Sequence, residues 1–451
     1  MKKNNKQNDG VQRGLKDRHI SMIAIGGCIG TGLFMTSGGA IHDAGALGAL
    51  IAYAVIGAMV FFLMTSLGEM ATYLPVSGSF STYATRFVDP SLGFALGWNY
   101  WFNWVITVAA DVTIAAQVIQ YWSPMQGIPA WVWSCIFLII IFALNSLSVR
   151  VYGESEYWFA LIKVVTVIIF IGIGILTILG IMGGEFVGFD TLVPKAIKQV
   201  FWRILLFYIL AIFIIGMLIP YDSKALMGGG DSIATSPFTL VFKNAGLAFA
   251  ASFMNAVILT SVLSAGNSGM YASTRMLYSM SKDKLAYNSF GKTNKSGVPY
   301  VSLIATGVLV ILIFALQHLS GDAYEYIVAA SGMTGFIAWV GIAISHFRFR
   351  RAFDKQNYDK SKLKYKAKLF PFGPIFAGIL CVIVIIGQDV DFIKTGNFDM
   401  NRFFITYMGI PVFLIFFFYH KFRYKTKKIP LNKVDLRQDV SMEEVRHHKN
   451  N

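Results

Sequence analysis

The sequence predicts an all-α polytopic membrane protein, and three observations support this fold class. Of the 451 residues, 55% are hydrophobic and 14% are charged, whereas a soluble domain has about a quarter of its residues charged. Eleven apolar segments approach or exceed the roughly 20 residues that a helix needs to cross the hydrocarbon core. The Lys and Arg residues that give the net charge of +15 stand in short runs between these segments. This pattern is typical of cytoplasmic loops, so we expect a lipid bilayer and no nucleic acid as partner.

The segments can be placed in order along the chain. They span residues 20–41, 44–72, 93–121, 129–148, 157–182, 201–220, 245–274, 299–317, 325–346, 372–387 and 403–419. We expect a basic cytoplasmic tail over residues 1–18, a transmembrane domain over 19–420 and a second cytoplasmic tail over 421–451. The location that follows is the cytoplasmic membrane, crossed many times.

The loop charges predict the side on which each loop lies. Read forward from the basic N-terminus, the fifth segment must end outside, near Gly183. Read backward from the basic C-terminus, the 348–368 loop, with nine Lys and Arg against two Asp, is inside. The same backward reading of the loop charges places the segment that holds Lys195, Lys198 and Arg203 inside as well. Residues 183–200 would then have to cross the membrane, yet this stretch is too polar to do so without unsatisfied backbone groups. The charge pattern therefore indicates that one span is absent here.

The first span contains the run Gly26-Gly27-Cys28-Ile29-Gly30-Thr31-Gly32, which is poor in helix-forming residues. Glycine costs about 1 kcal/mol in a helix interior, so the run could unwind at mid-membrane depth. Unwound backbone would offer N–H groups to a carboxylate and C=O groups to an ammonium group or a cation. Alternatively, Gly26 and Gly30 form a GxxxG pair that serves close helix packing.

Two charged side chains lie within predicted spans. Asp111 falls in the middle of the third span, where a carboxylate needs a cavity or a partner. That partner is either a cationic group of a substrate or a structural hydrogen bond. Lys163 lies one to two turns inside the fifth span. It is either a side chain that reaches back to the cytoplasmic interface or a buried amine that loads and releases a proton.

The remaining residues of interest favour packing over chemistry. The run from Leu263 to Ala272 is rich in small polar residues, which allow close helix approach or line a polar path. The three cysteines lie in apolar stretches, and the seven histidines are scattered, so we expect neither a metal site nor a cofactor. Because no catalytic motif such as HExxH, GxSxG or a P-loop is present, we do not expect an enzyme.

Several motifs make the chain resemble bacterial amino-acid permeases of the amino acid–polyamine–organocation superfamily. They are GGCIGTGLF from Gly26, GEMA from Gly68 with PVSGSF from Pro75, and GWNYW from Gly97. Other stretches are similar to lysine-specific permeases in particular. They are WVITVAAD ending at Asp111, EYWF from Glu156 through Lys163, QVFWRIL from Gln199, the run from Leu263 to Tyr278, and SGMTGFIAW from Ser331.

The resemblance implies a twelve-helix transporter whose first ten helices form two inverted repeats, with the first and sixth helices broken around the substrate. The backbone of Ile29, Gly30, Thr31 and Gly32 would bind the α-carboxylate and α-amine of an amino acid. Lys163 would match the amine that couples transport to protons, and Asp111 an acidic position suited to a lysine side chain. Ser331 and Thr334 would belong to a gate on the tenth helix.

The sequence departs from the family pattern where the charge rule fails. Gly184 to Phe189 runs almost directly into Lys195, which leaves out the sixth helix and with it half of the expected site. The resemblance implies import of lysine by proton symport. The alternative is a transport-incompetent remnant, or a membrane protein that senses the substrate without moving it.

Overall fold

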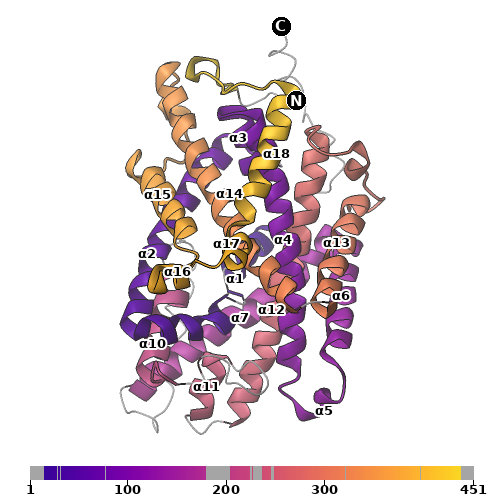
Figure 1. The fold of residues 1–451 in the computed structure, drawn as a ribbon, viewed down its shortest axis with the longest axis vertical. Coiled ribbons are helices and arrows are strands. Elements are labelled where there is room, and N and C mark those ends of the chain that lie inside the picture. The colour runs from indigo at the N-terminus through magenta and orange to yellow at the C-terminus, as the bar shows by residue number, and fades with distance from the viewer. Residues whose placement is uncertain are drawn as a thin grey trace. The chain divides into compact units, whose positions relative to one another are not determined.

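The computed structural model describes residues 15–27, 29–30, 32–76, 78–178, 204–223, 226, 236–244, 248–319, 321–396 and 398–437. The regular secondary structure of these residues is helical (Figure 1). Within the described residues, each of the eleven predicted apolar segments contains helix, so the predicted helical membrane fold is confirmed. The stretch 183–200, where a span is expected to be missing, lies outside the described residues.

The helices have the following bounds. They are α1 (Asp17–Gly26), η1 (Gly32–Thr36), α2 (Ser37–Tyr73), α3 (Ser79–Phe87), α4 (Pro90–Ile119), α5 (Ser123–Gln126), α6 (Ala130–Leu147), α7 (Val149–Ile178), η2 (Ile204–Leu210), α10 (Ala211–Leu218), α11 (Pro237–Asn244), α12 (Ala248–Lys282), η4 (Asn288–Gly291), α13 (Tyr300–Leu319), α14 (Gly321–Lys355), η5 (Lys360–Lys362), α15 (Phe372–Ile386), α16 (Val390–Thr395), α17 (Met400–Tyr407), α18 (Gly409–Tyr424) and η6 (Leu431–Lys433).

Four of these helices are long and apolar enough to cross a membrane by themselves. They are α2, α4, α6 and α7, with shorter apolar helices at Phe207–Leu218, Tyr300–Leu316 and Phe372–Ile386. The label α2 joins two spans, because Gly45 has φ +70° and ψ 165° and so interrupts the helix between them. Such a positive φ is accessible to glycine at little cost. Gly45 therefore separates the end of the first predicted span from the start of the second.

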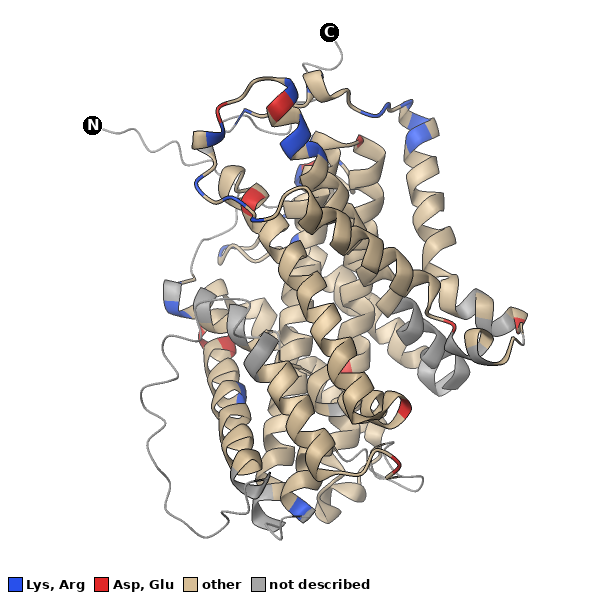
Figure 2. Ribbon diagram, turned by 90° about the vertical axis from the view of Figure 1, so that its left-hand side faces the viewer, with Lys and Arg blue, Asp and Glu red and all other residues tan. Residues whose placement is uncertain are grey.

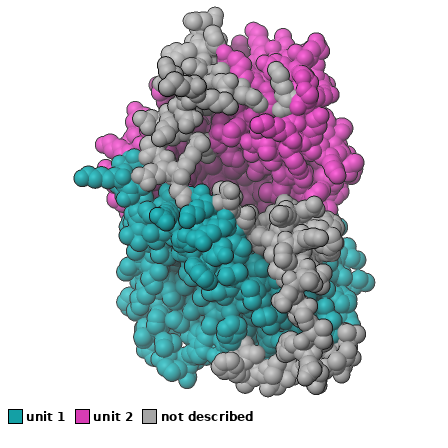
Figure 3. Space-filling view, turned by 180° about the vertical axis from the view of Figure 1, so that it is seen from behind, with its two compact units in different colours: residues 1–57, 108–270, 293–298 teal, residues 58–107, 271–292, 299–451 magenta. Residues whose placement is uncertain are grey.

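The described residues form two compact units (Figure 3). Unit 1 comprises residues 1–57, 108–270 and 293–298, and unit 2 comprises residues 58–107, 271–292 and 299–451. Within unit 1, α1 packs along α7, and α7 also contacts α10. Within unit 2, α14 is the central helix, since α3, α13, α15, α17 and α18 all contact it.

A buried ionic contact helps to fix the loop after α14 in unit 2. The side chain of Glu69, at the end of α2, is fully buried and lies 2.7 Å from the guanidinium Nε of Arg350 on α14. The same carboxylate accepts a hydrogen bond from the backbone N–H of Ala367 at 2.5 Å. The basic loop is therefore held against α2 and α14, although most of its charges face solvent.

Residues 429–437, which we call the C-terminal strap, pack against the basic end of unit 2. Val434 and Leu436 are almost fully buried, and the amide of Gln356 donates hydrogen bonds to the carbonyls of Leu431 and Val434, both at 2.8 Å. The strap and the 348–368 loop thus lie together, with Lys and Arg gathered around them (Figure 2). Both segments therefore lie at one end of unit 2, and the prediction that they face the cytoplasm stays a prediction.

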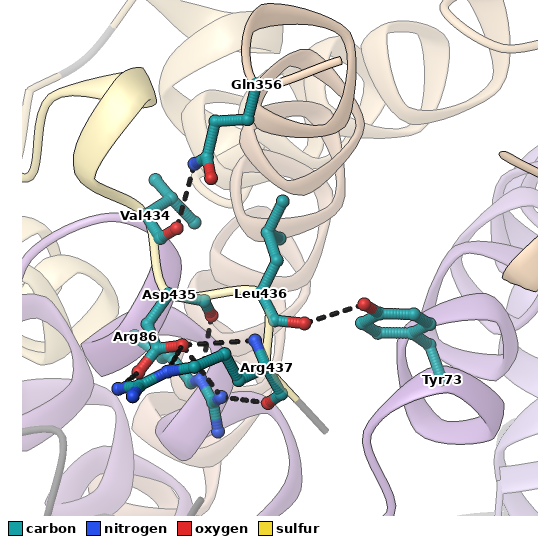
Figure 4. Close-up of polar contacts among 7 residues, drawn as sticks. All are labelled: Tyr73, Arg86, Gln356, Val434, Asp435, Leu436 and Arg437. Carbon is teal, nitrogen blue, oxygen red and sulfur yellow. Dashed lines mark hydrogen bonds and ion pairs between the residues drawn. The ribbon is translucent and has the colours of Figure 1, made fainter. Parts of the chain in front are cut away.

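Arg86 on α3 anchors the other end of the strap (Figure 4). Its Nε donates to the carbonyl of Asp435 at 2.9 Å, and its Nη2 donates to the carbonyl of Arg437 and pairs with the Asp435 carboxylate. The hydroxyl of Tyr73 donates to the carbonyl of Leu436 at 2.6 Å. The Arg86 side chain is fully buried, whereas its partners on the strap are less so, since Asp435 is half-buried and Arg437 is exposed.

Replacing Arg86 with Met is expected to destabilise the protein, because it removes the charged donor that holds the strap through partly buried hydrogen bonds. A hydrogen bond from a charged donor contributes about 1.5–3 kcal/mol, so a drop of a few degrees in the melting midpoint of the detergent-solubilised protein is expected. Arg423→Met, at an exposed position on α18, is the matched control and should leave the midpoint unchanged. Equal midpoints for both variants would contradict the anchoring role of Arg86.

This stabilisation should depend on pH through Asp435. Burial raises the pKa of the Asp435 carboxyl, but hydrogen bonds from Arg437 and the charge of Arg86 outweigh it, so the net pKa lies below its ordinary value of 3.8. A depressed pKa stabilises the fold above the unfolded value and ceases to do so as pH falls through the folded value. The difference in melting midpoint between Arg86→Met and the parent should therefore be largest at pH 7 and should shrink below about pH 4.

Candidate functional site

The first span is broken in unit 1, at the glycine-rich run. The helix α1 ends at Gly26, and regular structure resumes with the π-helical turn η1 at Gly32. Gly27, Ile29 and Gly30 lie outside regular helix, whereas Cys28 and Thr31 fall outside the described residues. The unwinding that the glycines suggested is therefore present.

Close packing, the alternative interpretation of the same run, is present at Gly26. A Cβ atom on Gly26 would lie 2.3 Å from the Cβ and 2.6 Å from the Cα of Ala160 on α7, so only glycine fits there. A Cβ on Gly30, in contrast, would meet the Cβ of Ala265 at an ordinary 3.6 Å. The two glycines of the GxxxG pair thus differ: Gly26 permits close contact with α7, and Gly30 belongs to the unwound stretch.

Lys163 points into the protein and not toward the cytoplasmic interface. Its side chain is 1% exposed, and its Nζ donates a hydrogen bond to the carbonyl oxygen of Gly26 at 3.3 Å. That carbonyl belongs to the last residue of α1, where helix C-terminal carbonyls lack intrahelical partners and attract positive charge. The amine therefore lies directly at the break of the first span.

A second side chain reaches the break from α12. The hydroxyl of Ser261 donates to the carbonyl of Ile29 at 3.3 Å. Together, Lys163 and Ser261 bind one carbonyl at the end of α1 and one within the unwound stretch. These two hydrogen bonds hold part of the backbone at the break, and the substrate-binding role of Ile29, Gly30 and Gly32 stays a prediction.

Asp111 lies in the interior of unit 1, on α4. Its side chain is 3% exposed, and a Cβ on Gly266 of α12 would lie 3.4 Å from the Cβ of Asp111 and 3.1 Å from Ile141 on α6. The carboxylate is therefore surrounded by protein, as the cost of exposing it to lipid requires. Its role toward a substrate stays a prediction.

Thr334 is placed within unit 2. It is buried on α14, and its hydroxyl donates to the side-chain carbonyl of Asn103 at 2.8 Å. Its own backbone carbonyl accepts a hydrogen bond from the amide of Asn99 at 2.7 Å. Thr334 thus joins α14 to α4. Ser331 lies on the same helix, but its side chain is outside the described residues, and the gate that both would form stays a prediction.

One ionisable residue near the break was not assigned a role from sequence. Glu156, quoted above only as part of a motif, is 2% exposed on α7. Its Oε2 accepts a hydrogen bond from Ser264 at 2.7 Å, and its Oε1 accepts one from Asn267 at 2.6 Å. Its spacing of seven residues from Lys163, which puts both on one helix face, is the signal that could have identified it.

The polar run on α12 accounts for much of this arrangement. One face of α12 carries four of its residues, Ser261, Ser264, Ala265 and Ser268. The three serines make hydrogen bonds: Ser261 with Ile29, Ser264 with Glu156, and Ser268 with Tyr152. Ala265 lies next to Gly30. The run thus both packs closely and carries polar contacts. In the described part of the chain, no three His, Cys, Asp or Glu side chains are grouped so that they could hold a metal ion.

Comparison with known proteins decides the family. The profile of the family described as amino acid permease matches residues 19–192 and 176–433, which together cover most of the chain. The chain belongs to the amino acid permease family. It is thus a multi-pass protein of the cell membrane that transports amino acids, and the relatives are named as transporters rather than as enzymes.

The relatives of this permease include lysine-specific ones. The chain is 51% identical to the lysine-specific permease of Lactococcus lactis, over 94% of this chain and 93% of the relative. It is 48% identical to the lysine-specific permease of Escherichia coli, over 94% and 97%. It is also 44% identical to a histidine permease of L. lactis, over 95% and 98%.

The permease resembles a solved transporter structure in fold. A manganese transporter of Eremococcus coleocola superposes with a TM-score of 0.51 at 12% identity, covering 88% of this chain and 92% of the other. At this identity the likeness concerns the fold alone. It supports the assignment of the permease to a helical, polytopic transporter architecture.

The comparisons also bear on the missing span. The alignment with the L. lactis lysine permease has 476 positions, and 94% of 451 residues is about 424, so about 52 positions of the relative have no counterpart here. The same calculation gives about 53 for the E. coli relative. The family match itself divides into two parts that overlap at residues 176–192, next to the place where the loop charges fail. A span with its connections needs fewer residues than this, since the membrane takes about 20.

Proposed function

We propose that this permease takes lysine as its substrate and couples the uptake of lysine to protons. The observation that carries the coupling is the hydrogen bond from Lys163 to the Gly26 carbonyl at the break. A hydrogen bond from a charged donor contributes about 1.5–3 kcal/mol, compared with about 0.5–1.5 for a neutral one. Deprotonation of Lys163 would therefore loosen the broken helix on which the substrate rests.

The preference for lysine has two supports. The relatives at 51% and 48% identity are named lysine-specific, and Asp111 supplies a buried carboxylate in the same unit as the break. The α-carboxylate and α-amine of lysine would bind the backbone at Ile29, Gly30, Thr31 and Gly32, and the side-chain ammonium would pair with Asp111. Histidine is the second candidate, because one relative at 44% identity is named a histidine permease.

Uptake of labelled lysine into proteoliposomes tests this proposal. It should be measured with an imposed proton gradient, with and without unlabelled histidine, arginine or a neutral amino acid as competitor. Two proteins should be compared: the chain as it stands, and the extended chain, in which the additional segment of the L. lactis relative is inserted after Gly188.

Proton-driven lysine uptake that is inhibited only weakly by arginine and by neutral amino acids would support the proposal. Stronger competition by histidine would favour the second candidate. Lysine binding by either protein without accumulation would favour a substrate sensor.

Replacing Asp111 with Asn should weaken lysine transport by the extended chain far more than it weakens folding. Loss of one partner from a desolvated ion pair costs about 3–5 kcal/mol, which corresponds to at least about 100-fold in kcat/KM for lysine. Asp222→Asn, at an exposed position in unit 1, is the control and should change little. Unchanged apparent affinity for lysine in Asp111→Asn would assign Asp111 a structural role.

A further inference from the structure

Glu156 and Lys163 are two buried ionisable side chains on one face of α7. Seven residues in a helix correspond to nearly two full turns, so the two positions differ by only about 20° around the axis and about 10.5 Å along it. Both side chains are at most 2% exposed. Long side chains on a helix lean toward its N-terminus, so Lys163, the longer of the two, covers part of this distance in the direction of Glu156.

The contacts of Glu156 orient it for proton exchange. Ser264 and Asn267 each donate a hydrogen bond to one of its two carboxylate oxygens, and the amide of Asn145 on α6 donates to the side-chain oxygen of Asn267 at 2.7 Å. The charge of Lys163 also interacts favourably with the carboxylate. The group is thus held in one place, at the end of a network that spans three helices.

A line of hydroxyl groups continues from Glu156 toward the start of α7. The hydroxyl of Tyr152, one turn before Glu156, is 3.3 Å from that of Ser268, and Ser268 lies one turn along the same face of α12 from Ser264, which donates to Glu156. The start of α7 carries Arg150, which the loop charges place on the cytoplasmic side. Hydroxyl groups both donate and accept protons, so this line can relay them.

We propose that Glu156 receives the proton that Lys163 releases and passes it toward the cytoplasm. This inference rests on the proton coupling proposed above. In the transfer, the Lys163 ammonium loses one proton to the Glu156 carboxylate, which leaves a neutral amine and a neutral carboxylic acid. The proton then leaves along Ser268 and Tyr152, and the carboxylate is restored.

Lys163 needs a second titratable group nearby to accept its proton, because the net charge of the buried pair then stays constant during the transfer. An isolated charge is expensive to bury, whereas a transfer within the pair keeps the net charge at zero both before and after. Lys163 can therefore release the Gly26 carbonyl without changing the net charge of the pair, and an unpaired carboxylate arises only in the later step, when the proton leaves Glu156. A purely structural Glu156 would instead join α7 to α12 and have no part in proton movement.

The variant Glu156→Gln separates these two roles, because glutamine has the same shape but cannot carry the proton. The control is Glu154→Gln, two residues away on α7 in a partly exposed ion pair with Arg18. In the extended chain, we expect Glu156→Gln to reduce proton-driven lysine accumulation about tenfold or more. Lysine–lysine exchange, which needs no net proton release, should stay within about twofold of the parent, and Glu154→Gln should change neither.

Infrared titration of the purified, unmodified chain gives a second measurement that does not need transport. The C=O stretch of a protonated buried carboxylic acid should appear as pH falls. It should be absent in Glu156→Gln, present in Glu154→Gln and shifted to a different pH in Lys163→Met. A band that is unaffected by Glu156→Gln would overturn the inference.

The transport results also distinguish this inference from the proposed function. An equal loss of accumulation and exchange in Glu156→Gln would show a structural role, and no loss of either would show no role. If Lys163→Met abolishes accumulation and Glu156→Gln does not, only the inference on Glu156 fails. If Lys163→Met retains proton-driven accumulation, the proposed coupling fails as well.

Discussion

The extended chain, with the segment of the L. lactis relative inserted after Gly188, is expected to accumulate lysine at least about tenfold better than the chain as it stands. The physical reason is that alternating access in this fold needs paired repeats and two broken helices facing the substrate. In unit 1 the first of these breaks is present at Gly26 to Gly32. The other belongs to the span for which the sequence has no apolar segment.

Two observations place the inserted segment near residue 188, and a third gives its length. The loop charges require a crossing between residues 183 and 200, and the family match divides over residues 176–192. The alignments with the relatives leave about 52 positions without a counterpart. No apolar segment elsewhere in the sequence is unassigned, so the chain has no evident substitute for the missing one.

The control for this experiment is an insertion of equal length rich in Gly and Ser, which adds flexible chain but no helix. Both versions should be compared with the parent at equal amounts of protein in proteoliposomes. Recovery with the relative's segment alone would support the argument. Equally strong proton-driven uptake by the unmodified chain would refute it and would mean that eleven segments suffice for transport.

Replacing Lys163 with Met is expected to abolish accumulation of lysine against its gradient in the extended chain, a loss of about 100-fold or more. Methionine fills a similar volume without a titratable group, so packing against α1 should be retained. The amine that donates to the Gly26 carbonyl would be lost, and with it the link between protonation and the broken helix. Proton-driven and exchange uptake of labelled lysine are the measurements.

A second substitution at Lys163 distinguishes charge from titration. Lys163→Arg keeps a positive charge that cannot be released in the working pH range, so accumulation should also be lost. Lys243→Met, at an exposed position on α11, is the matched control and should transport as the parent does. Proton-driven accumulation in Lys163→Met would instead assign the residue a structural role.

The glycine run shows how far the sequence could predict the site. Glycines at mid-membrane depth left two interpretations open, an unwound helix and close packing, because both require the absence of a side chain. The structure contains both, at different residues: Gly26 lies against Ala160, and Gly27, Ile29 and Gly30 lie outside regular helix. Only the neighbour of each glycine distinguishes the two uses, and that neighbour lies more than 100 positions away in the sequence.

Lys163 was ambiguous from sequence for a related reason. Its position one to two turns inside a span allowed its side chain to reach either the interface or the core, since the chain is long and flexible. The rotation of α7, which its packing against α1 sets, decides that it points to the break. Glu156 was missed altogether, because its role depends on Ser264 and Asn267 of a helix remote in the sequence.

The sequence by itself determined the helical membrane fold and the order of the eleven segments, and its loop charges predict that one span is absent near residue 188. These properties depend on the hydrophobicity and charge of each segment, because each segment enters the bilayer or stays outside it according to its own composition. Only the tertiary structure decided which buried groups meet: Lys163 with the Gly26 carbonyl, Glu156 with α12, and Arg86 with the C-terminal strap. Such contacts join residues far apart in sequence, and they depend on the rotation and close approach of helices, which composition and periodicity do not specify.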